Sequence, residues 1–500
     1  MTTATAAAGR RVRKRKRSNS DGLQPSPYRF SQAWKNGDVL TRLSLFIFGL
    51  GDLARKQIVK GLAFLASEVL IILYLIDKGG TYLGKLTTLG TAKQTKVKVN
   101  GFWVYQAGDN SVIILLYGVM SVFVVILLIL LATLSLRSAY KAQVAIKNGE
   151  RPNTIGQDLR SLFDQNAHVG LMFLPTLGIV VFTILPLVFM ISMAFTSYDQ
   201  NHTVLFSWVG LKNFGTVFGN SGGDVNAKLF FSVLAWTLIW AFFATFLNFF
   251  LGMFMAMIIE RKTIKGKAFW RACFSMSIAV PQFVSLLVMH TMLQRDGAIN
   301  RLLEGWGWIS GPLPWLSNAT WARVTVIVIN LWIGIPYTIM QITGILQNVP
   351  TELYEAAEID GANWWQRFCN VTMPYIFFVL TPYLITTFTG NVNNFNVIYL
   401  LTGGEPTPVG ASAGKTDLLI TWLYKLTVDK NNYNLGAVIG IMTFIVLAVV
   451  SLLTYRSSGS YKNEEGFRLV IQLLTPQSPR RPRAIHTSAV SPAMSSLTSS

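Results

Sequence analysis

Eight long apolar runs constrain this 500-residue chain more than any other feature of its sequence. A helix needs about 20 apolar residues to cross a bilayer, and each run is about that long. Only 13% of the residues are charged, against about a quarter in soluble domains. The sequence therefore predicts an all-α, polytopic membrane protein with about eight transmembrane helices, at 58–76, 112–136, 169–195, 229–259, 272–292, 323–346, 375–400 and 433–455.

The distribution of basic residues predicts the orientation of these spans. With the N-terminus in the cytosol, 30 of the 43 Lys and Arg residues fall in cytosolic segments and 12 in external ones. Cytosolic loops of membrane proteins carry an excess of Lys and Arg. Both termini are therefore expected to be cytoplasmic.

The sequence also predicts the character of the two terminal segments. Residues 1–57 form a basic cytosolic segment whose Arg/Lys block at 10–17 is expected to contact membrane lipid rather than nucleic acid. The block is not expected to belong to a cleavable signal peptide, because the next apolar run begins some forty residues later. Within it, residues 38–57 are expected to form an amphipathic helix on the inner membrane surface. Residues 456–500 are rich in Ser, Pro and Arg and predict a disordered cytosolic tail.

The spans offer few groups that could couple transport to an ion gradient. In the second to eighth spans the only titratable candidates are Arg323, at the edge of the sixth, and His290. Ion-coupled transporters commonly place carboxylates near the bilayer midplane, so an ion-coupled sugar symporter is the weaker alternative. The segment 409–416, VGASAGKT, lacks the first glycine of a phosphate-binding P-loop. The chain is thus expected to be no enzyme and to bind no cofactor or metal, with its energy supplied from elsewhere.

A compact polar segment, residues 354–368, interrupts the apolar pattern with the sequence YEAAEIDGANWWQRF. Its surroundings predict a helix–turn–helix over 351–372. Gly361 suits the left-handed residue that ends a helix, and Asn363 with Gln366 resembles a capping box that begins the next one.

The spacing within this segment resembles the EAA loop of bacterial ABC import permeases. Glu355-Ala356-Ala357 is followed after three residues by Gly361, and after nine more by the stretch Val371–Pro374. The family pattern ends in I-x-L-P, so Val371 and Met373 are conservative departures. The resemblance implies that Glu355, Ala356, Ala357, Gly361 and Pro374 belong to a coupling loop, residues 347–374, that docks onto a separate ATPase subunit.

Three further segments resemble maltose/maltodextrin permease subunits of the MalF type. The resemblance runs from about residue 165 to residue 455, and more loosely through the first two spans. It implies two initial transmembrane helices within 58–168 and a six-helix ABC importer type I permease core within 169–455. The matching segments read NLWIGIPY at 330–337, NVNNFNVIYLLTGGEP at 391–406 and TDLLITWLYK at 416–425.

Asparagines in the seventh span suggest a polar site inside the membrane. Four of them lie between Asn391 and Asn396, and an unsatisfied amide in hydrocarbon costs several kcal/mol. Helical spacing would place Asn391, Asn394, Phe395 and Ile398 on one face. Amides beside aromatic surface suit a sugar, while amide bonds between helices are the alternative.

The resemblance places the sugar-contacting positions of the family at Gly334, Tyr337, Asn391 and Asn394. Gly390 stands where the family member has an aromatic residue, and Ile278 and Gln282 replace a Tyr and a Ser. These departures leave the identity of the sugar open.

The resemblance also implies the partners and the location. The chain is expected to be a permease subunit of an ABC importer in the bacterial plasma membrane, taking up an oligosaccharide, with maltose or maltodextrin expected first and a galactoside as the alternative. Its partners would be a second permease with its own EAA loop, two ATPase subunits that use ATP, and an extracellular sugar-binding protein. A permease for glycerol phosphate would need basic residues in the pathway, and a structural scaffold would leave the EAA spacing unexplained.

Overall fold

The computed structural model describes residues 28–99, 102–153, 155–164, 167–219, 224–261 and 263–457. Residues 10–17 and the tail from 458 lie outside the described residues, so the expectations for these two segments stay predictions. The chain divides into two compact units, which are described separately. Unit 1 comprises the residues up to Ser192 with His202–Trp208, and unit 2 comprises Met193–Asn201 with the residues from Val209 onward.

The predicted membrane spans are confirmed in number and approximate position. The described residues contain seven helices long and apolar enough to cross a membrane, or eight if one bent pair counts as a single span. The observed spans are Ile58–Lys85, Ser111–Lys147, Ala167–Met193, Ala227–Glu260, Ala319–Gln347, Trp364–Leu401 and Tyr433–Arg456, with the bent pair Lys267–Ala279 and Gln282–Met292.

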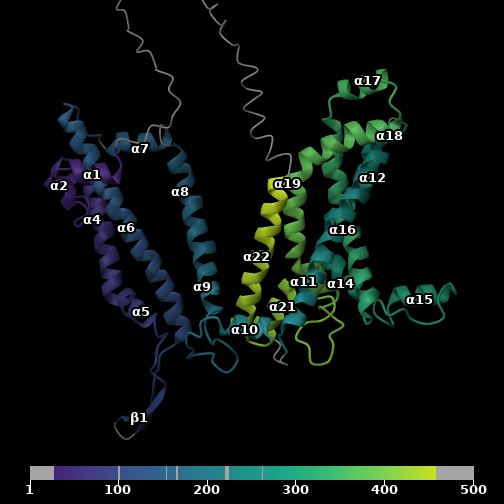
Figure 1. The fold of residues 1–500 in the computed structure, drawn as a ribbon, viewed down its shortest axis with the longest axis horizontal. Coiled ribbons are helices and arrows are strands. Elements are labelled where there is room, and N and C mark those ends of the chain that lie inside the picture. Colours follow the sequence, from purple (N-terminus) through teal and green to yellow (C-terminus); the bar gives the residue numbers. More distant parts are fainter. Residues whose placement is uncertain are drawn as a thin grey trace, which may run out of the picture. The chain divides into compact units, whose positions relative to one another are not determined.

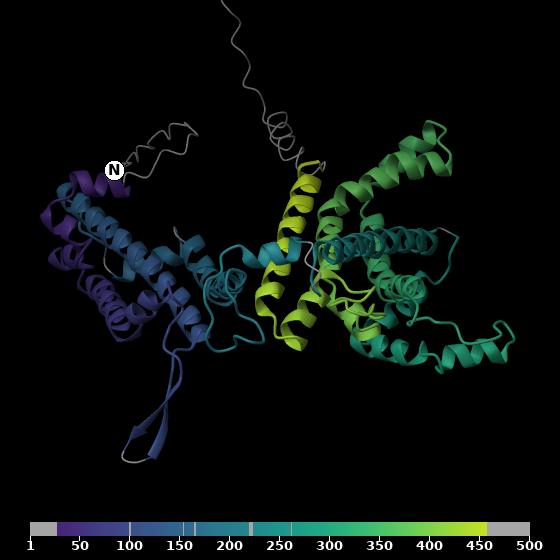
Figure 2. The ribbon, with the colours of Figure 1, turned by 60° about the horizontal axis from the view of Figure 1, so that its bottom comes forward.

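Unit 1 is built around two long antiparallel spans (Figures 1 and 2). The first is α4 (Ile58–Tyr74), a π-helical turn (Leu75–Gly79) and α5 (Gly80–Lys85), and the second is α6 (Ser111–Lys147). Shorter helices pack at one end of this pair, and a further span follows it. These elements are α1 (Phe30–Asn36), α2 (Val39–Leu43), α3 (Leu50–Ala54), α7 (Ile155–Phe163), α8 (Ala167–Ile179), a π-helical turn (Val180–Ile184) and α9 (Leu185–Met193).

The expectation of one amphipathic helix at 38–57 is wrong. The segment contains two short helices, α2 and α3, which are separated by a turn in which Gly49 has φ 77°. The turn is fixed by polar groups of the long spans: Glu68 Oε2 accepts from Phe48 N at 2.7 Å, and Ser135 Oγ accepts from Gly49 N at 2.8 Å. The carboxylate of Glu68, which lies within the first span, is therefore a buried acceptor that holds this turn.

The described residues confirm the predicted all-α class, with one short β-hairpin added to the helices. Strands β1 (Thr95–Val99) and β2 (Phe102–Gln106) pair antiparallel and project from the end of unit 1 opposite α1 and α2 (Figure 1). Asp109 holds the base of the hairpin, since its carboxylate accepts from Lys85 Nζ at 2.7 Å and from the N–H groups of Thr91 and Ala92 at 3.0 and 3.1 Å. These bonds lower the pKa of Asp109 to about 2, with the Lys85 bond as the largest cause.

The hairpin base is expected to stay fixed down to strongly acidic pH. Because the folded-state pKa of Asp109 is depressed, its contribution is present above the ordinary value of about 4 and is lost as the pH falls through about 2. A nitroxide label on Gln94→Cys, with both native cysteines replaced by serine, should therefore become mobile only near pH 2. In Asp109→Asn the label should be mobile at every pH; an immobile label in that variant at pH 7 would contradict this role.

Unit 2 contains the remaining spans as a helical bundle (Figures 1 and 2). Its core centres on the buried side chains of Trp240, Ile398, Ile339 and Phe249. The helices are α10 (Lys212–Phe218), α11 (Ala227–Phe242), a π-helical turn (Phe243–Leu247), α12 (Asn248–Glu260), α13 (Lys267–Met276), a 3₁₀ turn (Ser277–Ala279), α14 (Gln282–Met292), α15 (Ala298–Gly305), α16 (Ala319–Gln347), α17 (Thr351–Ile359), α18 (Trp364–Arg367), a π-helical turn (Phe368–Thr372), α19 (Met373–Val392), α20 (Phe395–Leu401), α21 (Leu419–Tyr424), a π-helical turn (Lys425–Asp429) and α22 (Tyr433–Ser457).

Two of the predicted spans are not continuous helices. The fifth is bent by 80° between α13 and α14, where Pro281 has an extended ψ of 131°. The seventh breaks at Asn393–Asn394, between α19 and α20. The second break lies within the asparagine cluster, so Asn391 and Asn394 do not share the face of one helix as the spacing predicted.

Candidate functional site: the coupling loop and the amide cluster

The EAA segment folds into the predicted helix–turn–helix at one end of unit 2 (Figure 1). Helix α17 ends in a complete Schellman motif: Gly361 N donates to Glu358 O at 3.0 Å, and Ala362 N donates to Ala357 O at 2.9 Å. Gly361 has φ 75°, a conformation that costs an L-residue about 1–2 kcal/mol. The predicted role of this glycine in the turn is therefore confirmed.

The second helix of the segment begins at the predicted capping box. Asn363 Oδ1 accepts from Gln366 N at 2.9 Å, and Gln366 Oε1 accepts from Asn363 N at 2.8 Å. Helix α18 then runs through a π-helical turn into α19, where Pro374 lies in the first turn. The EAA segment is thereby continuous with the seventh span.

Helix α17 is held to its neighbours at its inner side and exposed at its outer side. Tyr354 Oη lies 3.1 Å from Thr372 Oγ1, and Glu358 pairs with Arg367. A cavity of about 430 Å³ separates α17 from the end of α12. Glu355 and Ala356 are exposed, Ala357 is half-buried, and Ile359 is 87% exposed. Helix α17 therefore presents acidic and apolar side chains at the surface of unit 2, while contacts on its inner side fix its position.

The asparagine cluster is a hydrogen-bonded group at the break between α19 and α20. Asn391 Nδ2 donates to Thr245 Oγ1 at 3.0 Å, and Asn391 O accepts from Trp240 Nε1 at 3.0 Å. Asn394 caps α20 by accepting from Val397 N at 3.3 Å, and its Nδ2 lies 3.4 Å from Asn391 Oδ1. The two predicted site residues are thus brought together, although each also has a structural role.

Gly334 lies where α16 packs closely against α12. A Cβ at Gly334 would come within 2.6 Å of the Asn248 side chain, and a Cβ at Gly252 within 2.5 Å of Thr338 Cβ. Asn248 is buried, and its Oδ1 has no hydrogen-bond partner among the described residues. Because Asn248 follows Thr245 by one helical turn, Gly334 is linked to the amide cluster through that turn. Tyr337 is 49% exposed and makes no hydrogen bond to the cluster within the described ranges.

The three positions that depart from the family pattern lie at these helix breaks. Gly390 is exposed near the end of α19, and a Cβ there would meet no described atom within 4 Å. Ile278 and Gln282 flank the bend at Pro281, and both are half-buried. A Cβ at Gly390 would therefore displace no described neighbour.

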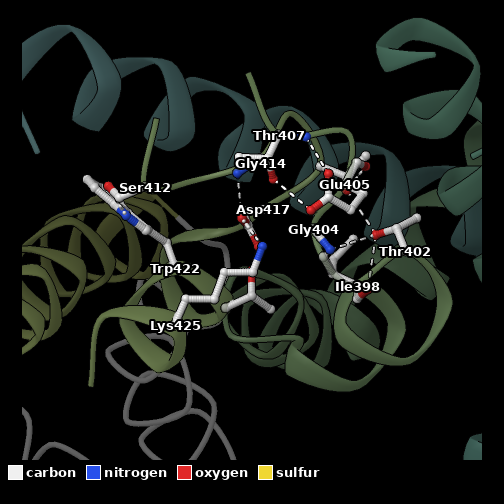
Figure 3. Close-up of polar contacts among 12 residues, drawn as sticks. Ile398, Thr402, Gly404, Glu405, Thr407, Ser412, Gly414, Asp417, Trp422 and Lys425 are labelled. Carbon is white, nitrogen blue, oxygen red and sulfur yellow. Dashed lines mark hydrogen bonds and ion pairs between the residues drawn. The ribbon is translucent and has the colours of Figure 1, made fainter. Parts of the chain in front are cut away.

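A buried ion pair organises the loop between α20 and α21 (Figure 3). Asp417 is fully buried and accepts from Lys425 Nζ at 2.7 Å, Gly414 N at 2.6 Å and Thr421 Oγ1 at 2.9 Å. Burial raises the pKa of Asp417, and the Lys425 ammonium opposes this shift. Thr402 Oγ1 lies 2.9 Å from Thr416 Oγ1, which ties the two ends of the loop together. The segment 409–416, which resembled a P-loop superficially, belongs to this loop.

Comparisons with known proteins give the family. Residues 248–459 match the model of the family "Binding-protein-dependent transport system inner membrane component". The chain is 35% identical to the galactooligosaccharides transport system permease protein GanP of Bacillus subtilis, over 83% of this chain and 96% of that protein. It is 34% identical to the maltodextrin transport system permease protein MalC of Streptococcus pneumoniae, over 83% of this chain and 95% of that protein.

The chain belongs to this permease family. It is a multi-pass membrane protein and a transport subunit, as its relatives are. A crystal structure of a bacterial ABC transporter for alginate is also similar, with a TM-score of 0.48 and 20% identity over 60% of this chain and 97% of that chain.

Sequence reasoning missed several polar residues of the permease core. Thr245 and Asn248 are buried within the predicted fourth span, and Asn330, one turn before Gly334, is also buried. A search for single amides within apolar runs would have found both asparagines. Asp417 and Lys425 carried no such signal, because charges in a loop are ordinarily solvent-exposed. Among the described residues, no cluster of His, Cys, Asp and Glu could hold a metal.

Proposed function

We propose that this chain is a permease subunit of an ABC importer that takes up maltodextrins. One observation carries the proposal: identity of 33–35% extends over 83% of the chain to permeases named for maltodextrin or galactooligosaccharide transport. The amide cluster supports a sugar substrate, because Asn391 and Asn394 place amide groups at a helix break inside the membrane.

The proposed assembly follows from the two ends of unit 2. The exposed helix α17 docks onto one of two ATPase subunits in the cytosol, where ATP is hydrolysed. A second permease with its own coupling loop completes the pathway, and an extracellular binding protein delivers the sugar. The excess of Lys and Arg on the side of the coupling loop supports this orientation, with both termini in the cytoplasm.

Galacto-oligosaccharide is the second candidate substrate. GanP is as similar to this chain as MalC is, and Gly390 leaves open space at a position where the maltose-transporting family has an aromatic residue. A site without that ring would favour a sugar that stacks elsewhere.

Uptake of radiolabelled maltotriose by cells lacking and regaining the gene tests the proposal. We expect uptake to return with the gene and to be competed by unlabelled maltose but not by galacto-oligosaccharide. Stronger competition by galacto-oligosaccharide would transfer the assignment to the second candidate. Uptake that depends on a sodium or proton gradient without need of the ATPases would overturn the ABC mechanism.

Replacement of Asn394 separates its amide donor from helix capping. Asn394→Asp keeps an oxygen that can accept from Val397 N, but it removes the Nδ2 donor that lies 3.4 Å from Asn391 Oδ1 and adds a carboxylate. We expect this variant to assemble normally and to transport about tenfold more slowly, the loss of roughly 1.4 kcal/mol that one hydrogen bond to substrate can supply. Asn394→Leu removes both the capping oxygen and the amide donor, and it should also lower the free energy of unfolding by about 1 kcal/mol. Normal uptake by Asn394→Asp would assign Asn394 to structure alone.

A further inference from the structure

A basic cavity lies within unit 1. It has a volume of about 810 Å³ and lies between the start of α4, the end of α6 and the segment that follows α6. This volume is in the range of small-molecule sites in proteins. Four basic side chains and no acidic one line it, namely those of Arg55, Lys56, Lys60 and Arg151.

The cationic groups of this cavity are only partly neutralised by the protein. Arg55 is engaged by Asp38, with the closer oxygen at 2.7 Å. Lys56 and Arg151 form no ion pair within the described residues. Glu150 lines a smaller adjoining cavity together with Lys60, Lys141 and Arg151, but it forms no ion pair with any of them within the described residues. The larger cavity is therefore suited to an anion, since none of the described residues that line it is acidic.

The backbone around the cavity is built to a fixed shape. Helix α6 ends in a Schellman motif, in which Glu150 N donates to Ala145 O at 2.9 Å, and this turn directs Arg151 back toward α4. Gln57 Nε2 then donates to Asn153 O at 2.8 Å, which joins the two sides. Helix α4 begins without a side-chain cap, so its first N–H groups and its positive end lie at the cavity.

Lys56 occupies a backbone position that favours glycine. Its φ is 63°, and the chain on either side forms the Schellman motif that ends α3, with Gln57 N donating to Asp52 O at 3.0 Å. The left-handed conformation is strained for lysine and unstrained for glycine. Lysine at this strained position supplies an ammonium group to the cavity wall, whereas glycine has no side chain to supply one.

One wall of the cavity is apolar and continues onto the lipid-facing surface of the first span. Ile58 and Val59 line the cavity at 58% and 55% exposure, and Leu62, one turn along α4, is 51% exposed. A ligand with an anionic head and apolar chains matches both parts. Gln57 Oε1 has no partner among the described residues and could accept a hydrogen bond from a headgroup hydroxyl.

We propose that this cavity binds the phosphodiester headgroup of an anionic membrane phospholipid, of which phosphatidylglycerol is the matching type. Lys56 and Arg151 pair with the phosphate, the start of α4 donates to it, and the acyl chains follow Ile58 and Val59 along α4. Placement in the inner leaflet rests on the proposed orientation, whereas the headgroup chemistry does not. Basic pockets between transmembrane helices are known to take such lipids.

Native mass spectrometry of the full chain, released from nanodiscs of mixed phosphatidylcholine and phosphatidylglycerol, tests the proposal. We expect the wild-type chain to retain phosphatidylglycerol at least tenfold more tightly than Lys56→Gly and Arg151→Gln. Lys56→Gly also relieves backbone strain, so its melting temperature should not fall, and a loss of lipid cannot be blamed on unfolding. Two control variants should retain the lipid. Asn431→Gly relieves the backbone strain of a left-handed residue (φ 52°) without changing the charge. Lys98→Gln removes a positive charge from the hairpin, outside the cavity.

Equal lipid retention by the cavity variants and by Lys98→Gln would overturn the proposal. Release of the lipid by millimolar inorganic phosphate would also overturn it, because the site would then take free phosphate. Labelling of a Lys56→Cys thiol by a membrane-impermeant reagent in intact cells would overturn the inner-leaflet placement. Lipid retention, thiol labelling and sugar uptake are measured in separate experiments. A failure of the proposed lipid site can therefore be distinguished from a failure of the proposed transport function.

Discussion

Gly361→Pro is expected to abolish uptake while leaving the chain inserted in the membrane. Proline fixes φ near −65° and has no N–H, whereas Gly361 has φ 75° and donates to Glu358 O. The substitution therefore destroys the turn that ends α17 and misaligns the exposed helix relative to α18. We expect sugar uptake to fall by more than a hundredfold and the bound ATPase to lose its stimulation by substrate.

A matched variant at the opposite end of unit 2 controls for this substitution. Gly307 has φ 71° and ends α15 in the same motif, with Gly307 N donating to Glu304 O at 2.9 Å. Gly307→Pro should disturb its own helix end to a similar extent without uncoupling ATP hydrolysis from uptake. Equal loss of coupling in both variants, or normal uptake in Gly361→Pro, would remove the coupling role from the α17 turn.

Lys425→Met is expected to be the most destabilising single substitution outside the coupling loop. It leaves the fully buried carboxylate of Asp417 without its cation, and breaking a buried pair in this way costs about 3–5 kcal/mol. The loop from Thr402 to Asp417 should then lose its fixed conformation. Thermal unfolding of the purified protein, followed by circular dichroism, measures the loss.

Two further variants test whether the unpaired buried charge of Asp417 causes the loss of stability in Lys425→Met. Lys430 pairs with Asp224 at 3.1 Å, but both side chains are at least 36% exposed, so Lys430→Met should cost at most about 1 kcal/mol. The double variant Asp417→Asn/Lys425→Met removes both charges and should recover part of the stability lost in Lys425→Met. If the double variant is as unstable as the single one, the effect arises from lost packing.

The sequence was most informative where local chemistry alone decides the structure. The spans followed from the length of the apolar runs, because the bilayer requires a helix of that length. The turn of the coupling loop followed from Gly361, Asn363 and Gln366, since each of these residues satisfies backbone groups within a few positions of itself.

The features that were missed depend on partners distant in sequence or on competing local effects. The positions of proline do not predict where the helices break. Pro281 lies at an 80° bend. Three other prolines lie within intact helices, namely Pro175, Pro336 and Pro382. The turn at Gly49 depends on Ser135, 86 residues away. No local pattern distinguishes such long-range acceptors from ordinary polar residues.

Gly334 and Gly390, the two glycines near the amide cluster, differ in the space that each leaves for a Cβ. Gly334 is closed to substitution, because a single added carbon would collide with Asn248. Gly390 is open, since a Cβ there would meet no described atom within 4 Å. Directed evolution toward new sugars should therefore accumulate replacements at Gly390, while libraries randomised at Gly334 should return the parental codon.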